Sequence, residues 1–187
     1  MAWYGLSRMP TEAVSAARLF FAIWPDQAVR EQIIAATKSA VDAAGGRPIP
    51  PENYHLTLAF LGSVSAPYLA AVRQAGRVSG FPTFTLTLAR TGYWPRSRIA
   101  WLGPLACPEP LRALVAGLWE PLAAVGLSAA NPDYKPHLSL ARKVPGGLES
   151  RLLQPIEWPV TEFVLVRSDT SPAGSAYTAL EHFPAAD

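Results

Sequence analysis

The sequence predicts an α+β chain made of two related lobes, and the order of its elements carries this prediction. A strand–helix–strand order near the start of the chain returns in the second half, with a local hairpin between the two. Residues 83–88 alternate between polar and apolar side chains, as expected of an antiparallel strand with one buried face. The 187 residues are enough for one core shared by two small lobes.

The first half of the chain carries four expected elements. Residues 19–24 form an apolar run typical of a buried strand, and residues 27–44 repeat apolar side chains at roughly helical spacing. Asp26 can cap that helix, and Pro67 suits the first turn of a later one. We therefore expect strands at residues 19–24 and 54–61, a helix at residues 27–44 ended by Gly45 and Gly46, and a second helix opening at Ser65.

The second half is expected to hold more strands than helices. After the alternating strand, a turn at residues 93–97 leads into a short apolar segment that completes a hairpin. A further helix ends at Gly126, since glycine favours helix termination. The expected elements are strands at residues 83–88, 98–102, around His137, 162–167 and 176–183, and a helix at residues 109–125, with the last two strands forming a final hairpin.

Composition excludes several classes of protein. Hydrophobic residues make up 50% of the chain and charged residues 16%, which is a globular rather than a disordered composition. The formal net charge of +2 is too small to indicate nucleic-acid binding, but it does not repel an anionic substrate. The single cysteine, Cys107, cannot form an intramolecular disulfide, and no Cys/His cluster has zinc-ligand spacing. Because these features fit a reducing cytosol, we expect a cytoplasmic protein with no metal ion and no cofactor.

Neither a membrane helix nor a signal peptide is expected. No apolar run approaches the length of about 20 residues that a membrane helix needs. Residues 1–17 carry Arg8 and Glu12 and lack the uninterrupted apolar segment of a signal peptide.

Two of the three histidines share one tetrapeptide pattern. Residues 55–58 and 137–140 both spell His-Leu-(Thr/Ser)-Leu. At average residue usage, one histidine shows this pattern by chance about once in 1000 cases. Residues two apart on a strand point to the same side, so each motif presents an imidazole and a hydroxyl to one surface while its leucines fill the core. If the two strands are related by a pseudo-twofold axis, both sets meet in one cleft.

This set of side chains suits phosphodiester hydrolysis. A neutral imidazole can take a proton from water, and an imidazolium can give one to the departing ribose oxygen. The ordinary histidine pKa of about 6.5 allows both forms near neutrality. The hydroxyls of Thr57 and Ser139 can donate hydrogen bonds to the phosphate. A lone histidine on a half-buried strand is more often structural. The repetition therefore favours function for the pair, whereas His182, which lacks a matching partner, is expected to be structural.

The segments around both histidines resemble a known family. Residues 47–62 resemble the first signature of the bacterial and archaeal RNA 2',3'-cyclic phosphodiesterases, historically called 2'-5' RNA ligases, within the 2H phosphoesterase superfamily. Residues 134–142 resemble the second signature. Residues 18–23 and 98–103 are similar to the opening strand and the middle hairpin of that family, so the resemblance covers about residues 18–183.

The resemblance implies a bilobal 2H phosphoesterase fold, in which two pseudo-twofold-related lobes with antiparallel sheets line a central cleft and helices lie outside. It implies a single two-lobed catalytic domain at residues 18–187. Residues 1–17 have no counterpart in the family and are expected to form an N-terminal tail, which is either disordered or the result of translation from a start codon upstream of the natural one. It also implies metal-independent hydrolysis of RNA 2',3'-cyclic phosphate ends to 2'-phosphate, with 2'-5' ligation in reverse. The residues matching the motifs are His55 and His137 as catalytic residues and Thr57, Ser139 and Arg142 as substrate-binding residues.

Individual roles follow from the same resemblance. It assigns His55 as the acid for the leaving 3' oxygen and His137 as the base for water. Arg142 is expected to bind phosphate, and its alternative is an ordinary solvated arginine. From the strand pattern alone, Phe60 is expected in the core, because a regular strand would point it away from His55, and base stacking by Phe60 would need a twist or bulge. Trp94 is expected in the core as well.

Several substrates and functions stay open at this level. The expected partner is RNA with a 2',3'-cyclic phosphate end or a small cyclic nucleotide. The protein is expected to be a monomer and not to associate with membranes. The same chemistry could act on another cyclic phosphate, such as ADP-ribose 1'',2''-cyclic phosphate, or on an RNA 3' end. A non-catalytic RNA-binding module is a different class, and the intact histidine pair argues against it. A metal site using both histidines lacks a third ligand at a recognisable spacing.

Overall fold

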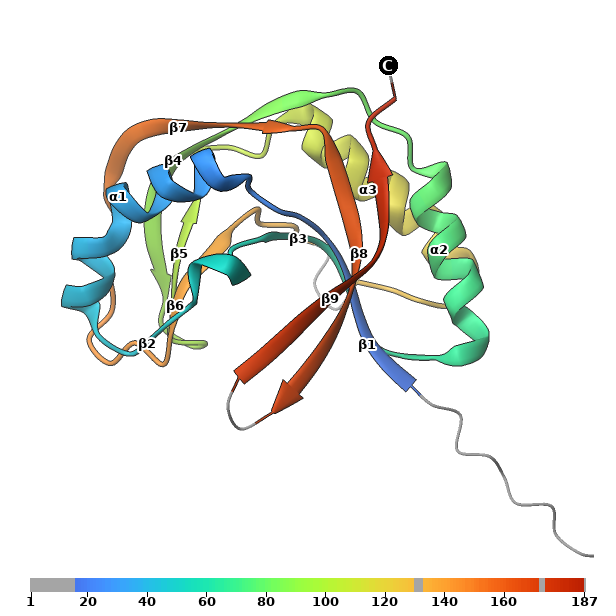
Figure 1. Cartoon of the computed structure of the whole chain (residues 1–187), viewed down its shortest axis with the longest axis horizontal. Helices are drawn as coiled ribbons and strands as arrows, with labels where there is room; N and C mark the ends of the chain where they lie inside the picture. The colour runs from blue at the N-terminus through green and yellow to red at the C-terminus, as the bar shows by residue number, and fades with distance from the viewer. Residues whose placement is uncertain (1–15, 130–132, 172–173, 187) are drawn as a thin grey trace, which may run out of the picture.

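The computed structural model describes residues 16–129, 133–171 and 174–186 (Figure 1). The helices are α1 (Gln27–Ala44), α2 (Leu69–Val78) and α3 (Glu109–Ala124), and short 3₁₀ turns occupy Pro51–Asn53 and Ala66–Tyr68. The strands are β1 (Ala16–Ile23), β2 (Arg47–Pro48), β3 (Leu56–Ser65), β4 (Phe84–Trp94), β5 (Ile99–Gly103), β6 (Leu138–Arg142), β7 (Leu152–Val160), β8 (Glu162–Ser171) and β9 (Gly174–Pro184).

These strands pair into one sheet that is nearly divided in two. Its order is β7-β4-β5-β6-β3-β1-β8-β9, with β2 also pairing with β6, and all these strand pairs are antiparallel. Between β3 and β6 the register contains a single residue pair, Leu56 opposite Leu138. One half therefore holds β2, β4, β5, β6 and β7, and the other holds β1, β3, β8 and β9. This confirms the prediction of two lobes with antiparallel sheets.

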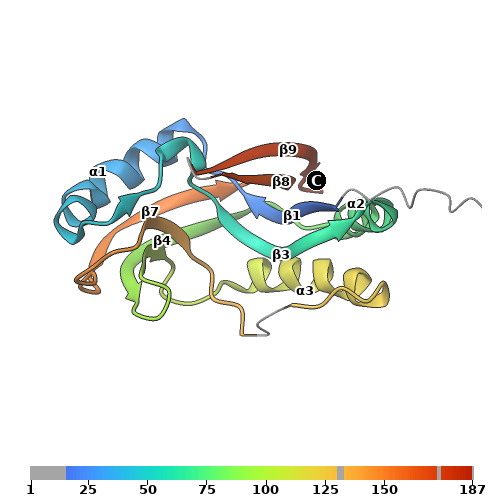
Figure 2. The ribbon, with the colours of Figure 1, turned by 90° about the horizontal axis from the view of Figure 1, so that it is seen from below.

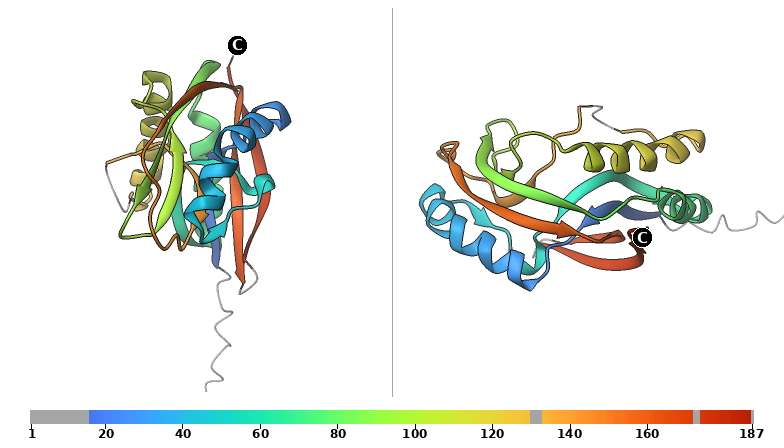
Figure 3. Two further views of the ribbon diagram at one scale, coloured as in Figure 1. Left: turned by 90° about the vertical axis from the view of Figure 1, so that its left-hand side faces the viewer. Right: turned by 90° about the horizontal axis from the view of Figure 1, so that it is seen from above.

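Each half of the chain contains a helix that lies between two strands of one half of the sheet, as a strand–helix–strand unit. The helix α1 lies between β1 and β3 in the sequence, and α3 lies between β5 and β6, so the two units share one order. In space, α1 packs against β7, whereas α3 packs against β3 and α2. The helices α1 and α3 thus lie on opposite sides of the sheet (Figures 2 and 3), each against the half that its own unit does not belong to.

The apolar run of β1 is buried on both faces. Leu19 and Phe21 lie in the main core, whereas Phe20 and Ala22 lie in a second, smaller cluster with residues of β8. A strand covered on both faces needs no polar side, which explains why this segment does not alternate. The motif leucines of β3 and β6 fill the main core as predicted. Leu56, Leu58, Leu138 and Leu140 are each at most 2% exposed.

The predicted start signals mark the beginning of two helical segments. Asp26 caps α1 as predicted, since its side chain accepts a hydrogen bond from the Val29 amide at 2.8 Å. The second helical segment opens after Ser65, but it starts as the 3₁₀ turn Ala66–Tyr68, which contains Pro67, and the α-helix α2 follows directly from Leu69.

Two strands of the sheet, β2 and β7, have no counterpart among the sequence predictions. β7 contains Pro155 and Pro159, which interrupt the apolar pattern and resemble loop punctuation. In the structure β7 is an edge strand paired only with β4. Proline is tolerated on an edge strand, because the missing amide faces no neighbour there. The side chains of Ile156, Trp158 and Val160 are buried in turn, so β7 does cover the core.

A glycine brings β2 against β6. Gly46 has a φ of 89°, and a Cβ atom at this position would lie 2.7 Å from the carbonyl oxygen of Arg142. Glycine accepts both the left-handed backbone and the close approach, which a larger residue would not. The following residue, Arg47, is therefore able to pair directly with Arg142.

Only the last two residues of the expected N-terminal tail, Ala16 and Ala17, lie within the described residues. Ala16 and Ala17 belong to β1, and the rest of the expected tail, residues 1–15, lies outside the described residues. The tail therefore stays a prediction. Among the described residues, no helix is both long and apolar enough to cross a membrane.

Candidate active site

His55 lies at the start of β3, just after the 3₁₀ turn Pro51–Asn53. Its Nδ1 is 2.8 Å from the backbone carbonyl oxygen of Asn53. Because a carbonyl oxygen can only accept, this contact places a proton on Nδ1 and leaves Nε2 as the free nitrogen of the neutral ring. The turn is itself closed by a hydrogen bond from the Asn53 amide to the Pro50 carbonyl at 2.8 Å, which fixes the position of the acceptor.

His137 repeats this relationship at the start of β6. Its Nδ1 is 2.8 Å from the carbonyl oxygen of Lys135, again two residues earlier in the chain. Trp94 packs in an edge-to-face arrangement with the ring, with 4.4 Å between centroids. In both motifs Nε2 is therefore the nitrogen available for proton exchange. The repeated tetrapeptide corresponds to a repeated local geometry.

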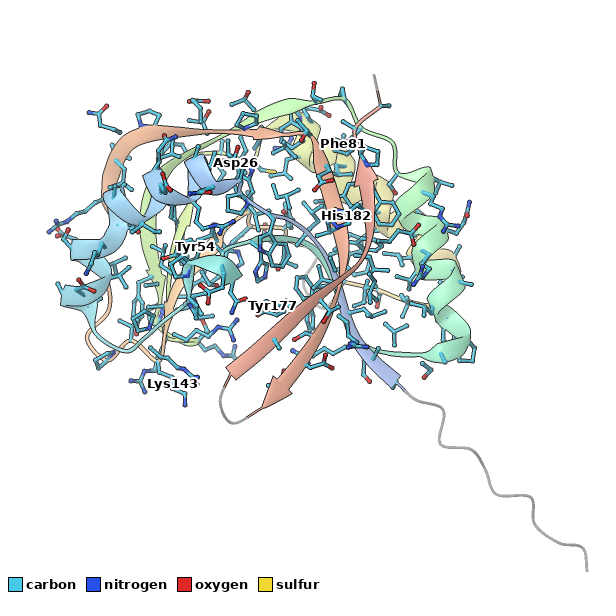
Figure 4. All side chains as sticks on the ribbon, viewed as in Figure 1. Asp26, Tyr54, Phe81, Lys143, Tyr177 and His182 are labelled. Atoms are coloured by element: carbon cyan, nitrogen blue, oxygen red, sulfur yellow. The ribbon has the colours of Figure 1, made fainter. Side chains whose placement is uncertain are left out.

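Three aromatic side chains hold the imidazole of His55. Trp24 stacks on it with 4.7 Å between ring centroids, and Phe20 and Tyr177 each pack at 5.1 Å. The indole nitrogen of Trp24 donates to the Glu52 carbonyl at 3.1 Å, so the stacking ring is itself anchored. Tyr177 reaches the site from β9 (Figure 4). The orientation of the His55 ring is thus set by side chains from β1 and β9 and by Trp24, which directly follows β1.

Burial lowers the pKa of both histidines. The pKa of His55 falls from 6.5 to about 4, mainly through burial. The hydrogen bond to Asn53 opposes this change, and the positive charges of Arg142 and His137 add to it. Burial also lowers the pKa of His137, against the hydrogen bond to Lys135. The free site therefore favours two neutral imidazoles, and a bound anionic phosphate would raise their pKa values again.

His55 opens onto a hollow of about 450 Å³ enclosed by β1, β3, the end of β6 and the β8–β9 hairpin. Its lining side chains are cationic, hydroxyl-bearing or aromatic, with no carboxylate among those described. They are Arg18, Phe20, His55, Thr57, Phe60, Arg142, Ser168, Thr170, Ser175 and Tyr177. Two predicted substrate-binding residues, Thr57 and Arg142, thus lie beside His55.

His137 opens onto a second hollow, of about 680 Å³, which Thr57 also lines. Thr57 therefore lies between the two histidines. Ser139 lies opposite Trp101 in the sheet, and Trp101 and His137 together line a further hollow of about 380 Å³. Ser139 itself borders none of these three hollows. The structure brings His55, Thr57, His137 and Arg142 together around these hollows and leaves Ser139 outside them.

Other ionisable side chains gather elsewhere. No three His, Cys, Asp or Glu residues come together as a metal site would require within the described ranges. His182 lies on β9 (Figure 4), where its Nδ1 is 3.2 Å from a carboxylate oxygen of Glu162. It lines none of the three hollows, which agrees with the structural role expected for it.

Known proteins of similar sequence cover most of the chain. The family model described as LigT like Phosphoesterase matches residues 23–101. The RNA 2',3'-cyclic phosphodiesterase of Escherichia coli (strain K12) is 39% identical over 171 residues, which are 89% of this chain and 95% of that protein. The chain belongs to the LigT-like phosphoesterase family.

Further relatives extend this result. The RNA 2',3'-cyclic phosphodiesterase of Thermus thermophilus is 35% identical to this LigT-like phosphoesterase over 178 residues, 89% of each chain. The crystal structure of apo E. coli LigT has a TM-score of 0.84 and covers 92% of this chain and 99% of its own, at 35% identity. The complex of E. coli LigT with 3'-AMP has a TM-score of 0.85. These matches confirm the resemblance and the 2H phosphoesterase fold.

In this LigT-like phosphoesterase Phe60 lines the cleft, so the prediction that it packs in the core is wrong. The register between β1 and β3 contains a bulge opposite the step from Phe21 to Ala22. The extra residue turns Phe60 to the same face as Thr57. Its side chain is 42% exposed and lines the hollows of both histidines. The Arg18 guanidinium lies over the Phe60 ring, 4.6 Å from its centroid.

Besides Phe20, three further aromatic residues contact the histidines of the candidate site in this LigT-like phosphoesterase. Trp94 lies against His137 and lines its hollows, which corrects the prediction that it belongs to the core. Trp24 and Tyr177 were not identified from the sequence. Neither belongs to a repeated motif, and only the strand order β3-β1-β8-β9 brings both to His55.

Proposed function

We propose that this LigT-like phosphoesterase hydrolyses RNA 2',3'-cyclic phosphate ends to 2'-phosphates, with His55 and His137 as its proton-transfer pair. The single observation that carries the proposal is the matched geometry of the two imidazoles, each with Nδ1 bonded to the carbonyl two residues earlier. The substrate class is supported by relatives named RNA 2',3'-cyclic phosphodiesterase. A crystal structure of E. coli LigT with 3'-AMP adds support.

The proposed reaction needs one proton acceptor and one proton donor on opposite sides of phosphorus. Water attacks the phosphorus and gives a proton to one neutral imidazole. The bond from phosphorus to the 3' oxygen breaks, and the other ring, as imidazolium, gives that oxygen its proton. The product carries a 2'-phosphate and a 3'-hydroxyl. The two rings end with their protonation states exchanged, and solvent restores them.

The assignment of roles keeps His55 as the acid and His137 as the base. Since the pKa of free His55 is about 4, the acid form has to be produced when substrate binds. A phosphate next to His55 supplies the negative charge that raises this pKa, because an opposite charge within a few ångströms favours the charged form. Binding and activation are then linked at the same ring.

Stabilisation of the phosphate falls to Thr57, Ser139 and Arg142. Thr57 lines the hollows of both histidines, and Arg142 lines that of His55. A hydroxyl and a guanidinium aimed at non-bridging oxygens stabilise the charge that builds up there during attack. Ser139 lies two residues after His137 and outside the three hollows, so it would act on the phosphate at longer range or after a small movement.

The same site would join RNA ends through a 2'-5' bond if the 5'-hydroxyl of a second strand attacked the phosphorus in place of water, because the 3' oxygen leaves in both reactions and the two rings keep their roles. A small cyclic nucleotide would also fit the chemistry. We further propose that the enzyme works as a monomer in the cytoplasm.

The test is turnover of an oligonucleotide that ends in a 2',3'-cyclic phosphate, with and without EDTA. We expect a 2'-phosphate product, identified by chromatography against 2'- and 3'-phosphate standards, at rates that chelation leaves unchanged. Binding without turnover would overturn the enzymatic proposal in favour of an RNA-binding module. Complete loss in EDTA, restored by one divalent ion, would overturn the metal-independent mechanism.

A further inference from the structure

Three cations lie together where β2 meets the end of β6. Arg47 pairs directly with Arg142 across the antiparallel ladder, and Lys143 follows Arg142 in the chain. Directly opposed residues in such a ladder have Cα atoms about 4.5–5.5 Å apart, and like charges in that position destabilise the sheet. An anion that binds between two such guanidinium groups is attracted by both of them.

These cations line a hollow of about 290 Å³ that adjoins the hollow of His55. The two hollows share Arg142, Thr170, Ser175 and Tyr177, so they form one continuous groove. Figure 4 shows Lys143 near the end of β6 and Tyr177 on β9, the elements that wall this part of the groove. None of the described residues that line either hollow is an Asp or a Glu. The groove therefore suits a chain of negative charges.

The backbone around Lys143 is held in an unfavourable conformation. Lys143 has a φ of 55°, in the left-handed region that non-glycine residues avoid. Arg98 fixes the turn, since its side chain donates to the carbonyls of Val144 and Lys143, both at 3.2 Å. Such a conformation persists only where the surroundings enforce it. The direction in which Lys143 leaves the backbone, next to Arg142, is thus set by the fold.

We propose that Arg47 and Lys143, with Arg142, form a second phosphate subsite that binds the phosphate on the 5' oxygen of the terminal nucleoside. This inference rests on the proposed function, because it places the reacting cyclic phosphate beside His55 and its neighbour along the strand beside Arg47. One guanidinium group can donate two parallel hydrogen bonds to two phosphate oxygens, and an ammonium group adds a compact positive charge. The subsite would make the enzyme prefer RNA ends over unphosphorylated cyclic mononucleotides.

Four substrates separate the sources of the second phosphate. They are uridine 2',3'-cyclic phosphate, its 5'-phosphorylated form, diuridylate with a 2',3'-cyclic phosphate end, and the same dinucleotide with an uncharged methylphosphonate linkage. For the unaltered protein we expect kcat/KM to be about 10- to 100-fold higher for the two substrates with a charged second phosphate. The methylphosphonate should behave like the unphosphorylated mononucleotide. Preference for the dinucleotide alone would identify the internucleotide linkage as the group that is bound.

Two variants and one control test the residues. Arg47→Gln and Lys143→Gln should lower the preference for a charged second phosphate by about 3- to 30-fold, chiefly through KM. Turnover of the unphosphorylated mononucleotide should stay at the wild-type rate. Lys143 is exposed, so its variant reports on the subsite even if the loss of Arg47 disturbs β2. Arg151→Gln is the control, because that exposed arginine pairs with Glu149 outside the groove and should leave every rate unchanged.

Some outcomes would overturn the inference while the proposed function stands. One is equal kcat/KM for all four substrates in the unaltered protein. Another is a loss in the Lys143 variant that is as large for the mononucleotide as for the dinucleotide. If the unaltered protein turned over none of the substrates, the proposed function would fail first and the subsite with it.

Discussion

Leu56 lies opposite Leu138, and within the described residues this pair is the whole register between β3 and β6. Both side chains are fully buried, at 0% exposure. His55 immediately precedes one leucine and His137 immediately precedes the other. The contact that joins the two halves of the sheet therefore also fixes the relative position of the two imidazoles.

Shortening one of these two leucine side chains should destabilise the fold. We expect Leu138→Ala to lower the free energy of unfolding by about 2–5 kcal/mol, through lost burial and the cavity that remains. Leu152→Ala is the matched control, because Leu152 is 74% exposed on the edge strand β7. It should cost no more than about 0.5 kcal/mol in the same urea titration. Similar losses of unfolding free energy in both variants would show that the contact between Leu56 and Leu138 does not hold the two halves of the sheet together.

The lowered pKa of His55 makes stability depend on pH. Its pKa is about 4 in the folded protein, against 6.5 for an ordinary histidine. Between these values the unfolded chain binds a proton that the folded protein does not, so the free energy of unfolding falls as the pH drops through this window. After a discount for the partial exposure of the ring, we expect a contribution of about 1–3 kcal/mol.

The measurement is urea unfolding of the wild type and His55→Gln at several pH values from 4 to 6.5. The variant should have the shallower slope of stability against pH. Parallel slopes would mean that His55 does not titrate as its burial predicts.

Removal of the Thr57 hydroxyl should impair catalysis. Thr57→Val keeps the shape of the side chain but loses a donor that lies between the two histidines, so we expect kcat/KM to fall by about 10- to 1000-fold. Ser139→Ala should lose less, because Ser139 borders none of the three hollows lined by the histidines. Thr87→Val, whose hydroxyl donates to Glu157 on the edge of the sheet at 3.0 Å, serves as the control. A larger loss of kcat/KM for Ser139→Ala than for Thr57→Val would contradict the greater importance that we assign to the Thr57 hydroxyl.

The acid and the base can be told apart with an activated leaving group. Such a group departs without a proton, so it should rescue His55→Ala far better than His137→Ala if His55 is the acid. The measured quantity is the ratio of kcat/KM for the activated and ordinary substrates in each variant. Rescue of His137→Ala alone would exchange the two roles.

The sequence predicted the parts of the site that are local in the chain. The two tetrapeptides identify both histidines, because alternation on a strand by itself places the leucines inward and the hydroxyls outward. The alternation alone could not place Phe60, because the bulge in β3 opposite Phe21 and Ala22 turns this residue to the other face. Nor could it bring Trp24 and Tyr177 to His55, since their contacts depend on the order of strands far apart in the sequence.

Prolines explain the largest gap in the predicted fold. Pro155 and Pro159 hide the alternation of buried residues along β7, and only its place at the sheet edge makes them acceptable. The pairing of Arg47 with Arg142 was equally hidden, because a two-residue strand leaves no periodic pattern to detect.

The central claim is that two histidines carry the proton transfers, and the most direct test is kcat/KM on a cyclic-phosphate-ended oligonucleotide for three alanine variants. His55→Ala and His137→Ala should each fall by about 100-fold or more, and each should lose one limb of a bell-shaped pH profile. His182→Ala, on the exposed face of β9, should match the wild type. Wild-type turnover in either His55→Ala or His137→Ala would contradict the account.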